Sequence, residues 1–428
     1  MPKLERHRTD ISPFASLGLI EPILRAVEAC KYTAPTPIQI TAIPALLDGR
    51  DVIGSAQTGT GKTAAFALPV LQRVAKMTTP RESKSPRVLV LEPTRELALQ
   101  VEGAFERYAK HLRSVRISSA FGGVGKYEQT HLLRVGVDVL VGTPGRVLDL
   151  RLQSRLDLTD VQILILDEAD RMFELGFVPD VRRLLGVLPP ERQTAFFSAT
   201  LPDPILRFAR EVMHNPLRLE ANRRSSAAPG ISQRACFVES AHKFPLLVEL
   251  LRREEKGRSL VFVTAQRDAD KLAKRLEKEG VAATVLHGGI SQTDRFAAVD
   301  GFRDGSIKVL VATDVAARGL DIPGITLVVN LELPSEPKQY VHRIGRTGRA
   351  GASGTAIAIC DETERKRFQG IQTLIRQDFE PLVDHAWHAP GIMDDVMHRP
   401  GHWRAPSLHP DRVRHHALRI PPPRSRKR

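Results

Sequence analysis

Short apolar runs and amphipathic stretches alternate along most of the chain. Runs that are almost continuously apolar are typical of parallel strands covered by helices on both faces. In the first half these predicted strands are residues 88–91, 115–117, 137–141, 163–166 and 194–197, after an earlier run that ends at Val52-Ile53. Residues 1–50 show helical spacing, with Leu19, Ile23 and Val27 on one face. The pattern predicts an α/β unit over residues 1–218.

A second α/β unit is predicted over residues 233–380. Its expected strands are 235–238, 259–263, 283–286, 308–312, 327–330 and 355–359, and its expected helices are 242–255, 266–279, 291–303 and 335–345. Between the two units, Ser, Pro and Gly gather at residues 221–230, so we predict an exposed linker over 219–232. The chain shows no repeat of solenoid period.

The composition of the chain predicts a disordered tail and favours one class of binding partner. Residues 381–428 contain 9 Lys and Arg against 4 Asp and Glu, and 7 of the 14 His, which predicts a disordered basic tail. The whole chain has a net charge of +14 and 42% hydrophobic residues, enough to form real cores. Such a basic protein favours polyanionic partners, although many soluble proteins without nucleic-acid partners are basic too.

The cysteines and the first residues of the chain indicate the cellular compartment. Cys30, Cys236 and Cys360 match neither a zinc site nor a disulfide framework, which is typical of a reducing cytosol. The first residues lack an apolar signal region, and no apolar segment of about 18 residues follows. We therefore expect a cytoplasmic protein without membrane contact, and a monomer.

The strongest chemical signal is a phosphate-binding loop after the run that ends at Val52-Ile53. It consists of Ala56, Gln57, Thr58, Gly59, Thr60, Gly61, Lys62 and Thr63, and a helical pattern follows. Loop N–H groups and a helix N-terminus bind phosphates, Lys62 adds a positive charge, and the Thr63 hydroxyl can ligate Mg²⁺. The alternative is a Gly-rich turn before a helix.

Acidic residues follow the predicted strand 163–166. A carboxylate at a strand end beside such a loop, here Asp167, can hold Mg²⁺ directly or through water. Glu168 could orient an attacking water and accept its proton. The alternative is an acidic helix start, since Asp and Glu favour first turns.

With Asp167-Glu168-Ala169-Asp170 and the segments below, the chain resembles the DEAD-box ATP-dependent RNA helicases over about residues 12–380. The resemblance implies two RecA-like parallel-sheet domains in tandem, with ATP between them. The lean core and short tail are similar to the bacterial RhlE-like subgroup. Ribosome assembly and RNA decay are the pathways that the family association suggests.

The resemblance assigns further nucleotide contacts. Residues 12–40 resemble the adenine-reading segment of the family, with Phe14, Tyr32 and Gln39 at the ATP. The Gln39 amide can match the adenine edge, and Tyr32 offers a stacking face. Lys31 stands where the family usually has Gly, which puts the local turn in question. Gly319 and Asp321 would also approach the nucleotide, with Asp321 at the ribose.

Two segments would couple ATP to the rest of the molecule. By resemblance, the hydroxyls of Ser198 and Thr200 bind Asp170, although Ser-Ala-Thr alone is more typical of a helix cap. We expect His342, Arg346 and Arg349 on one face of a helix, because they are three or four residues apart. Arg346 and Arg349 would be arginine fingers and His342 a link between motifs. The alternative is a basic patch on the RNA surface.

The RNA-side residues are weak signals one by one, since each could serve only a turn or a cap. Together, in family order, they outline a groove that contacts backbone phosphates and sugars. They are Pro93, Thr94, Arg95, Gly122, Gly123, Thr143, Arg146, Thr264, Gln292, Arg295 and Thr313.

The sequence thus predicts an RNA-stimulated ATPase that binds single-stranded RNA across two domains and unwinds short duplexes, with ATP and Mg²⁺ as cofactors. An ATP-gated RNA clamp that assembles or remodels complexes is the alternative. A DNA translocase of the same superfamily is disfavoured by the combination of Gln39 with Asp167–Asp170.

Overall fold

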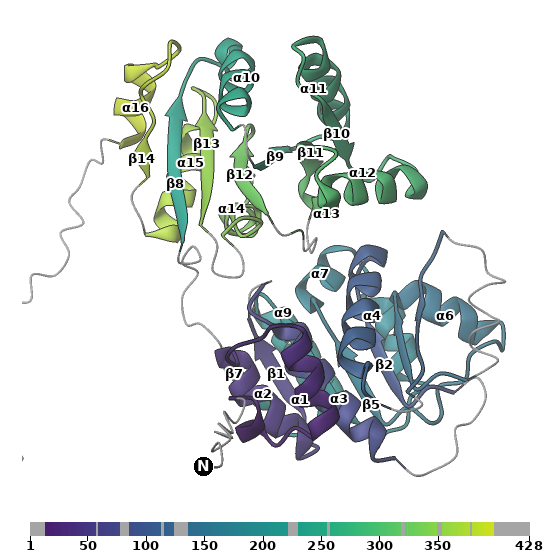
Figure 1. The fold of residues 1–428 in the computed structure, drawn as a ribbon. Helices are drawn as coiled ribbons and strands as arrows, with labels where there is room; N and C mark the ends of the chain where they lie inside the picture. Colours follow the sequence, from purple (N-terminus) through teal and green to yellow (C-terminus); the bar gives the residue numbers. More distant parts are fainter. Residues whose placement is uncertain are drawn as a thin grey trace, which may run out of the picture.

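The structure is a computed structural model of the 428-residue chain. It describes residues 13–56, 59–77, 85–112, 115–123, 136–220, 230–254, 257–317, 322, 324–348, 353–376 and 379–397. Two seven-stranded sheets confirm the prediction of two α/β domains in tandem, and every strand pair is parallel (Figure 1).

The first domain has the strand order β3-β4-β2-β5-β6-β1-β7. Its strands are β1 (Val52–Ser55), β2 (Val88–Leu91), β3 (Ile117–Ala120), β4 (Val139–Gly142), β5 (Ile163–Leu166), β6 (Gln193–Ser198) and β7 (Leu217–Glu220). Its helices are η1 (Ala15–Leu17), α1 (Glu21–Ala29), α2 (Pro37–Leu47), α3 (Lys62–Ala75), α4 (Arg95–Ala109), α6 (Pro144–Leu152), α7 (Ala169–Glu174), α8 (Val178–Leu185) and α9 (Asp203–Val212).

Each face of this sheet is covered by its own helices. Strand residues such as Val90 and Ile165 pack with α1 to α4, whereas their neighbours Leu89 and Leu164 pack with α6 to α9. Both faces are buried, which explains why the strands read as continuous apolar runs. The polar residues that follow the strands therefore gather at one edge of the sheet.

The second domain has the strand order β10-β11-β9-β12-β13-β8-β14. Its strands are β8 (Ile231–Phe237), β9 (Arg258–Val263), β10 (Ala283–Leu286), β11 (Val309–Thr313), β12 (Ile325–Asn330), β13 (Gly354–Cys360) and β14 (Glu380–Pro381). Its helices are η2 (Ser240–His242), α10 (Lys243–Arg253), α11 (Gln266–Lys278), α12 (Gln292–Asp304), α13 (Asp314–Ala317), α14 (Pro337–Ile344), α15 (Arg365–Ile375) and α16 (Pro390–Met397). Helices α10 and α11 cover one face, and α12 to α16 pack on the second face.

Two predicted boundaries are wrong. The expected linker 219–232 overlaps β7 and β8 because Leu217–Glu220 and Ile231–Phe237 pair with neighbouring strands. The expected tail begins too early, since β14 pairs with β8 and α16 packs on α15, with Ile392 and Val396 buried. Pro and His mask this apolar spacing in the sequence. The second domain thus extends to Met397, and residues 221–229 and 398–428 lie outside the described residues.

Several strands are shifted by a few residues from their predicted positions. One of them is β3, which spans Ile117–Ala120 where residues 115–117 were expected. Ser118 and Ser119 are buried there, and Ser119 Oγ donates to Glu102 at 2.6 Å. A polar strand with a partner on α4 gives no apolar run for the pattern to detect.

The turn after α1 forms with Lys31 at the position where the resemblance implies glycine. Lys31 has a φ of 59°, in the left-handed region that glycine adopts without steric cost. Its N–H donates to the Glu28 carbonyl at 2.8 Å and holds the turn before Tyr32. The substitution therefore costs backbone energy without changing the fold.

Replacing Lys31 with Gly should stabilise the first domain by about 1 kcal/mol, because it removes the left-handed strain. For a domain of this size we expect its thermal midpoint to rise by about 2–4 °C. Differential scanning calorimetry of the full chain measures the change, with Lys76→Gly at the end of α3, where φ is negative, as the control. A lower midpoint for Lys31→Gly would contradict the assignment.

Candidate nucleotide site and the grooves between the domains

The loop after β1 is shaped to approach an anion. Gly59 and Gly61 both have a φ of +87°, and Gly61 precedes the first residue of α3. A Cβ on Gly61 would lie 2.4 Å from Nε2 of Gln39, so a larger residue would displace that side chain. Ala56 N donates to the Ser198 carbonyl at 3.1 Å and ties the loop to β6. Gln57 and Thr58 lie outside the described residues.

Lys62 lies among carboxylates at the carboxyl edge of the sheet. Its Nζ is 2.6 Å from Oε1 of Glu168 and 3.9 Å from Oδ1 of Asp167, and all three side chains are buried. Burial raises the pKa of Glu168, but the charge and hydrogen bond of Lys62, with the charges of Arg171 and Arg346, together outweigh burial and bring the pKa to about 2. Burial dominates at Asp167 and raises its pKa to about 6 against the pull of Lys62. Thr63, half-buried in the first turn of α3, follows Lys62 directly.

The acidic segment is connected to β6 by hydrogen bonds. Oδ2 of Asp170 accepts from both the N–H and the Oγ1 of Thr200 at 3.0 Å. Oγ of Ser198 accepts from Asp170 N at 3.2 Å and donates to the Thr200 carbonyl at 2.6 Å. The predicted bonds between these hydroxyls and Asp170 are therefore present. Glu168 reaches its position with a φ of 49°, a strained conformation for a side-chain residue.

Gln39 is built into the loop itself. Its Oε1 accepts from Thr36 N at 2.9 Å in a capping box, and its Nε2 donates to the Gly61 carbonyl at 3.1 Å. One amide hydrogen and one carbonyl lone pair remain for another partner. The sequence did not indicate this direct link between residue 39 and the loop.

The two predicted aromatic contacts differ in access. Tyr32 is 39% exposed, whereas Phe14 is completely buried in the core, so the expectation of direct ATP contact by Phe14 is wrong. Phe14 stacks on Tyr32 with ring centroids 6.4 Å apart, and the hydroxyl of Tyr32 is 2.9 Å from that of Tyr108. Phe14 and Tyr108 thus position Tyr32.

The second domain brings Arg346 to the same site. Helix α14 ends at Ile344, so the prediction that His342, Arg346 and Arg349 share one continuous helix is wrong. Gly345 turns the chain, and Nε of Arg346 donates to the His342 carbonyl at 3.1 Å. The positive charge of Arg346 contributes to the lowered pKa of Glu168 in the first domain. Arg349, Gly319 and Asp321 lie outside the described residues.

Arg343, to which the sequence assigned no role, anchors this segment. It is 1% exposed, and its guanidinium binds both carboxylate oxygens of Asp314 at 2.6 and 2.7 Å. It also donates to Asn330 and to the Glu332 carbonyl, and lies 4.9 Å from the centre of the Phe262 ring. The signal was present, because Arg343 stands between His342 and Arg346 in the same motif.

A groove of about 600 Å³ collects most of the predicted RNA-side residues, from both domains. They are Pro93, Thr94, Arg95, Gly122, Gly123, Thr143, Arg146, Gln292 and Arg295. Arg95 donates to Oε1 of Gln292 at 3.0 Å, and the Nε2 of Gln292 donates to Glu96 at 3.2 Å. Nε of Arg295 lies 2.5 Å from Glu96 Oε1. Glu96, which sequence reasoning missed, thus joins the domains here.

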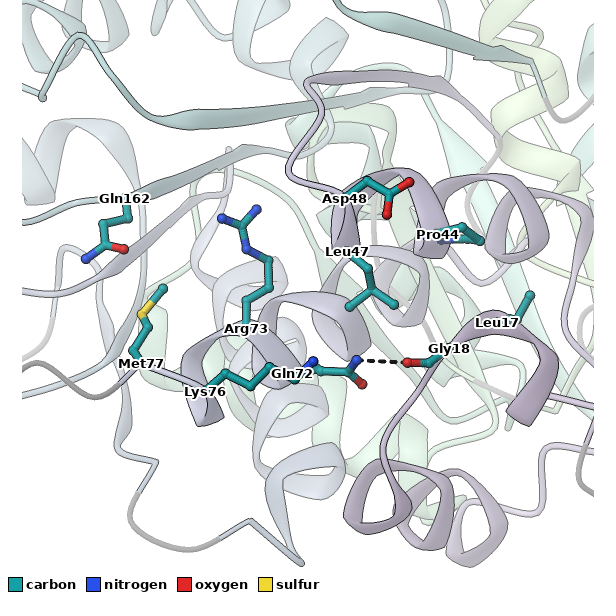
Figure 2. A pocket seen from close by; sticks show the side chains of 10 residues that line it. All are labelled: Leu17, Gly18, Pro44, Leu47, Asp48, Gln72, Arg73, Lys76, Met77 and Gln162. Carbon is teal, nitrogen blue, oxygen red and sulfur yellow. Dashed lines mark hydrogen bonds between the residues drawn. The ribbon is translucent and has the colours of Figure 1, made fainter.

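Thr264 and Thr313 line a separate cavity of about 660 Å³. Thr200 and His342 line it too, which brings the coupling residues of the two domains together. A third cavity, of about 620 Å³, lies among residues such as Leu47, Arg73 and Gln162 (Figure 2). In it Gln72 donates to the Gly18 carbonyl at 2.8 Å, and none of the predicted site residues lines it.

Within the described ranges, no helix is long and apolar enough to cross a membrane.

Comparison with known families gives two matches. The DEAD/DEAH box helicase family matches residues 36–208, and the helicase conserved C-terminal domain matches residues 242–351. The DEAD-box ATP-dependent RNA helicase CshA of Bacillus cereus is 40% identical over 380 residues, 88% of this chain and 71% of that protein. The ATP-dependent RNA helicase DeaD of Haemophilus influenzae is 42% identical over 86% of this chain and 59% of its own length.

Solved structures agree with both domains. S. cerevisiae Dbp5 bound to RNA and ADP BeF3 aligns with a TM-score of 0.79 at 34% identity, covering 87% of this chain and 95% of that chain. Mss116p bound to ssRNA and AMP-PNP aligns with a TM-score of 0.78 at 26% identity, covering 93% and 84%.

The Lys62–Glu168 pair should make the stability of the first domain depend on pH. The folded pKa of Glu168, about 2, is below its usual value, so the pair stabilises the fold above about pH 4.3 and loses this effect toward pH 2. Glu168→Gln should cost about 3 kcal/mol at pH 7 and progressively less in acid. Urea unfolding at a series of pH values measures the difference, and a difference that stays constant would contradict it.

Proposed function

The chain belongs to the DEAD-box family of ATP-dependent RNA helicases, and we propose which of its residues perform the ATP-driven work on RNA. One observation carries the proposal: side chains of the two domains meet directly, because Glu96 of the first domain binds Gln292 and Arg295 of the second. A site completed by both domains can make ATP binding and domain closure a single event. RNA that contacts both domains is then gripped in the closed state.

We propose that Lys62 acts by exchanging partners. Without nucleotide it neutralises Glu168 at 2.6 Å. When the loop Ala56–Thr63 binds the phosphates of ATP, Lys62 turns toward them and the pKa of Glu168 rises for lack of its partner. Glu168 is then better able to orient the attacking water and accept its proton. The loop thus prepares the base as the substrate arrives.

The side chains present fit Mg²⁺. The Thr63 hydroxyl and the Asp167 carboxylate would hold the ion, directly or through water, as expected for an octahedral ion that keeps several waters. Bound there, Mg²⁺ would neutralise charge on the phosphates. Asp167 is already positioned, because its Oδ1 accepts from the N–H of Glu168 at 2.8 Å.

Adenine recognition rests on Gln39 and Tyr32. We propose that the remaining hydrogen and lone pair of the Gln39 amide pair with the adenine edge while Tyr32 stacks on the ring. Since Gln39 also binds the Gly61 carbonyl, adenine recognition is linked to the loop conformation. Gly319 and Asp321 would complete the site at the ribose.

Coupling and catalysis from the second domain involve a few side chains. We propose that Arg346 and Arg349 stabilise charge on the transferred phosphate, and that His342 communicates with Asp170 through Thr200. Thr200 and His342 line one cavity, which supports this connection. Arg343 would position Arg346 through its bonds to Asp314.

For RNA, we propose a backbone-directed grip on one strand in the groove of Arg95, Arg146 and Arg295, with Thr264 and Thr313 contributing from the adjoining cavity. Bending this strand separates a paired neighbour, and opening six base-pair steps costs on the order of 8 kcal/mol. ATP binding must favour closure by several kcal/mol to unwind such a duplex. Monomeric state, cytoplasmic location, RhlE-like subgroup and a role in ribosome assembly or RNA decay stay predictions from the sequence.

Glu168→Gln should bind ATP and RNA at near wild-type affinity but hydrolyse ATP at least about 100-fold more slowly, because the amide cannot accept the proton. RNA-stimulated phosphate release measures the rate, and strand separation of a short duplex measures the work. Near-normal hydrolysis would remove Glu168 from its role. Normal hydrolysis in the wild type without strand separation would instead favour an ATP-gated clamp.

Gln39→Ala should lower the ATP-to-GTP binding ratio about 10-fold, since both nucleotides lose the support of the loop but only adenine loses the partner of its base. Competition of each nucleotide against a fluorescent ADP analogue measures the ratio. Gln72→Ala serves as the control, because Gln72 binds Gly18 in a different cavity of the same domain. An unchanged ATP-to-GTP ratio would contradict adenine reading by Gln39.

A further inference from the structure

Glu92 is a buried acid that the helicase mechanism does not use. It follows β2 directly, and its N–H donates to the Gly142 carbonyl at 2.9 Å. On the other side of β2, Asp167 N donates to the Leu91 carbonyl at 3.2 Å, so Glu92 and Asp167 end adjacent strands. Glu92 is 0% exposed, and neither of its carboxyl oxygens has a hydrogen-bond partner among the described residues.

The side chain points toward the phosphate loop. Residues alternate across β2, and Glu92 has the parity of Val88 and Val90, which pack in the core beneath α3. Lys62 is the first residue of that helix. Glu92 and Asp167 end adjacent strands at the same edge of the sheet, and this is the edge where Lys62 begins α3 and lies 3.9 Å from Asp167.

An acid in this position is costly for the fold alone. Burial first, and then the charges of Asp167 and Glu168, raise the pKa of Glu92 well above its usual value, while Lys62 and Arg171 oppose the rise. A buried carboxyl without hydrogen bonds destabilises a protein by about 1–3 kcal/mol or more. An alanine would avoid this cost, so the site must offer the carboxyl a partner in another state.

The chemistry of the site identifies that partner. Within the described ranges, no three His, Cys, Asp or Glu side chains converge as direct metal ligands. A divalent cation held at Thr63 and Asp167 would therefore keep several waters. These waters are hydrogen-bond donors that require acceptors. The two unpartnered oxygens of Glu92 are acceptors at the same edge of the sheet.

We propose that Glu92 is an additional carboxylate of the cation site, which accepts hydrogen bonds from waters on a divalent cation bound with the nucleotide. This inference rests on the cation site proposed above. The bound cation brings positive charge that favours ionised Glu92, and its waters satisfy the carboxylate oxygens. Glu92 thereby increases the affinity of the nucleotide complex for the cation.

The test is the Mg²⁺ dependence of nucleotide binding in the full chain, with fluorescent ADP and MgCl₂ as probes. Glu92→Gln removes the charge and keeps the shape, and Glu92→Ala removes the carboxyl. In both variants we expect the Mg²⁺ midpoint to rise about 10-fold, as for loss of an outer-shell partner, while affinity in EDTA stays within about twofold of wild type. The matched control is Glu102→Gln, since Glu102 is a partly buried acid that binds Ser119 away from the loop.

The possible outcomes distinguish the role of Glu92 from the existence of the cation site. Unchanged Mg²⁺ midpoints in both Glu92 variants would overturn the role of Glu92 and leave the cation site intact. A wild type whose nucleotide affinity ignores Mg²⁺ would overturn the cation site and this inference with it. Thermal unfolding in EDTA supports the test, because Glu92→Ala should match or exceed the wild-type midpoint once the unpartnered acid is gone.

Discussion

The ammonium of Lys62 holds together a group of acids that would otherwise repel one another in a water-poor setting. Asp167, Glu168 and Glu92 come from the ends of two adjacent strands, and each is buried. A like-charged cluster of this kind is stable only with a cation in its midst. Lys62 serves this purpose in the structure, and in the mechanism proposed above the nucleotide and its cation take over this role. The site is therefore a set of charges that must be re-paired at each step of the cycle.

Much of the fold was accessible from the sequence for a simple physical reason. Parallel strands buried on both faces, such as Ile163–Leu166, are apolar throughout and are separated by helical spacing. The phosphate loop and the acidic segment also follow strand ends, where a parallel sheet places its ligand. Patterns failed where polar residues replace the apolar run, as at Ile117–Ala120, and where Pro and His obscure a packed helix, as at Pro390–Met397.

The parts of the site that the sequence did not predict depend on tertiary contacts. Nothing local distinguishes Glu92 from a surface acid, or Glu96 from any residue of an exposed helix face. In the sequence Arg343 is one more basic residue of its motif. Only the structure shows that its guanidinium binds both carboxylate oxygens of Asp314. Gly345 ends α14 before Arg346, although spacing alone suggested a continuous helix. These side chains are held by partners that are distant in the sequence. The fold brings the partners together at the edges of the sheets, so the sequence alone does not show them.

If the groove binds RNA as proposed above, the contacts of Glu96 have a consequence for the rate of RNA release. The Glu96 carboxylate binds the donor groups of Arg295 and Gln292 that a backbone phosphate would also use. An incoming strand must therefore displace a carboxylate, and a departing strand leaves behind donors that the carboxylate can satisfy at once. Such an exchange lowers the net affinity, but it also lowers the barrier to dissociation, because no buried donor is left without a partner. In this groove Glu96 would therefore act as an intramolecular competitor of the bound RNA.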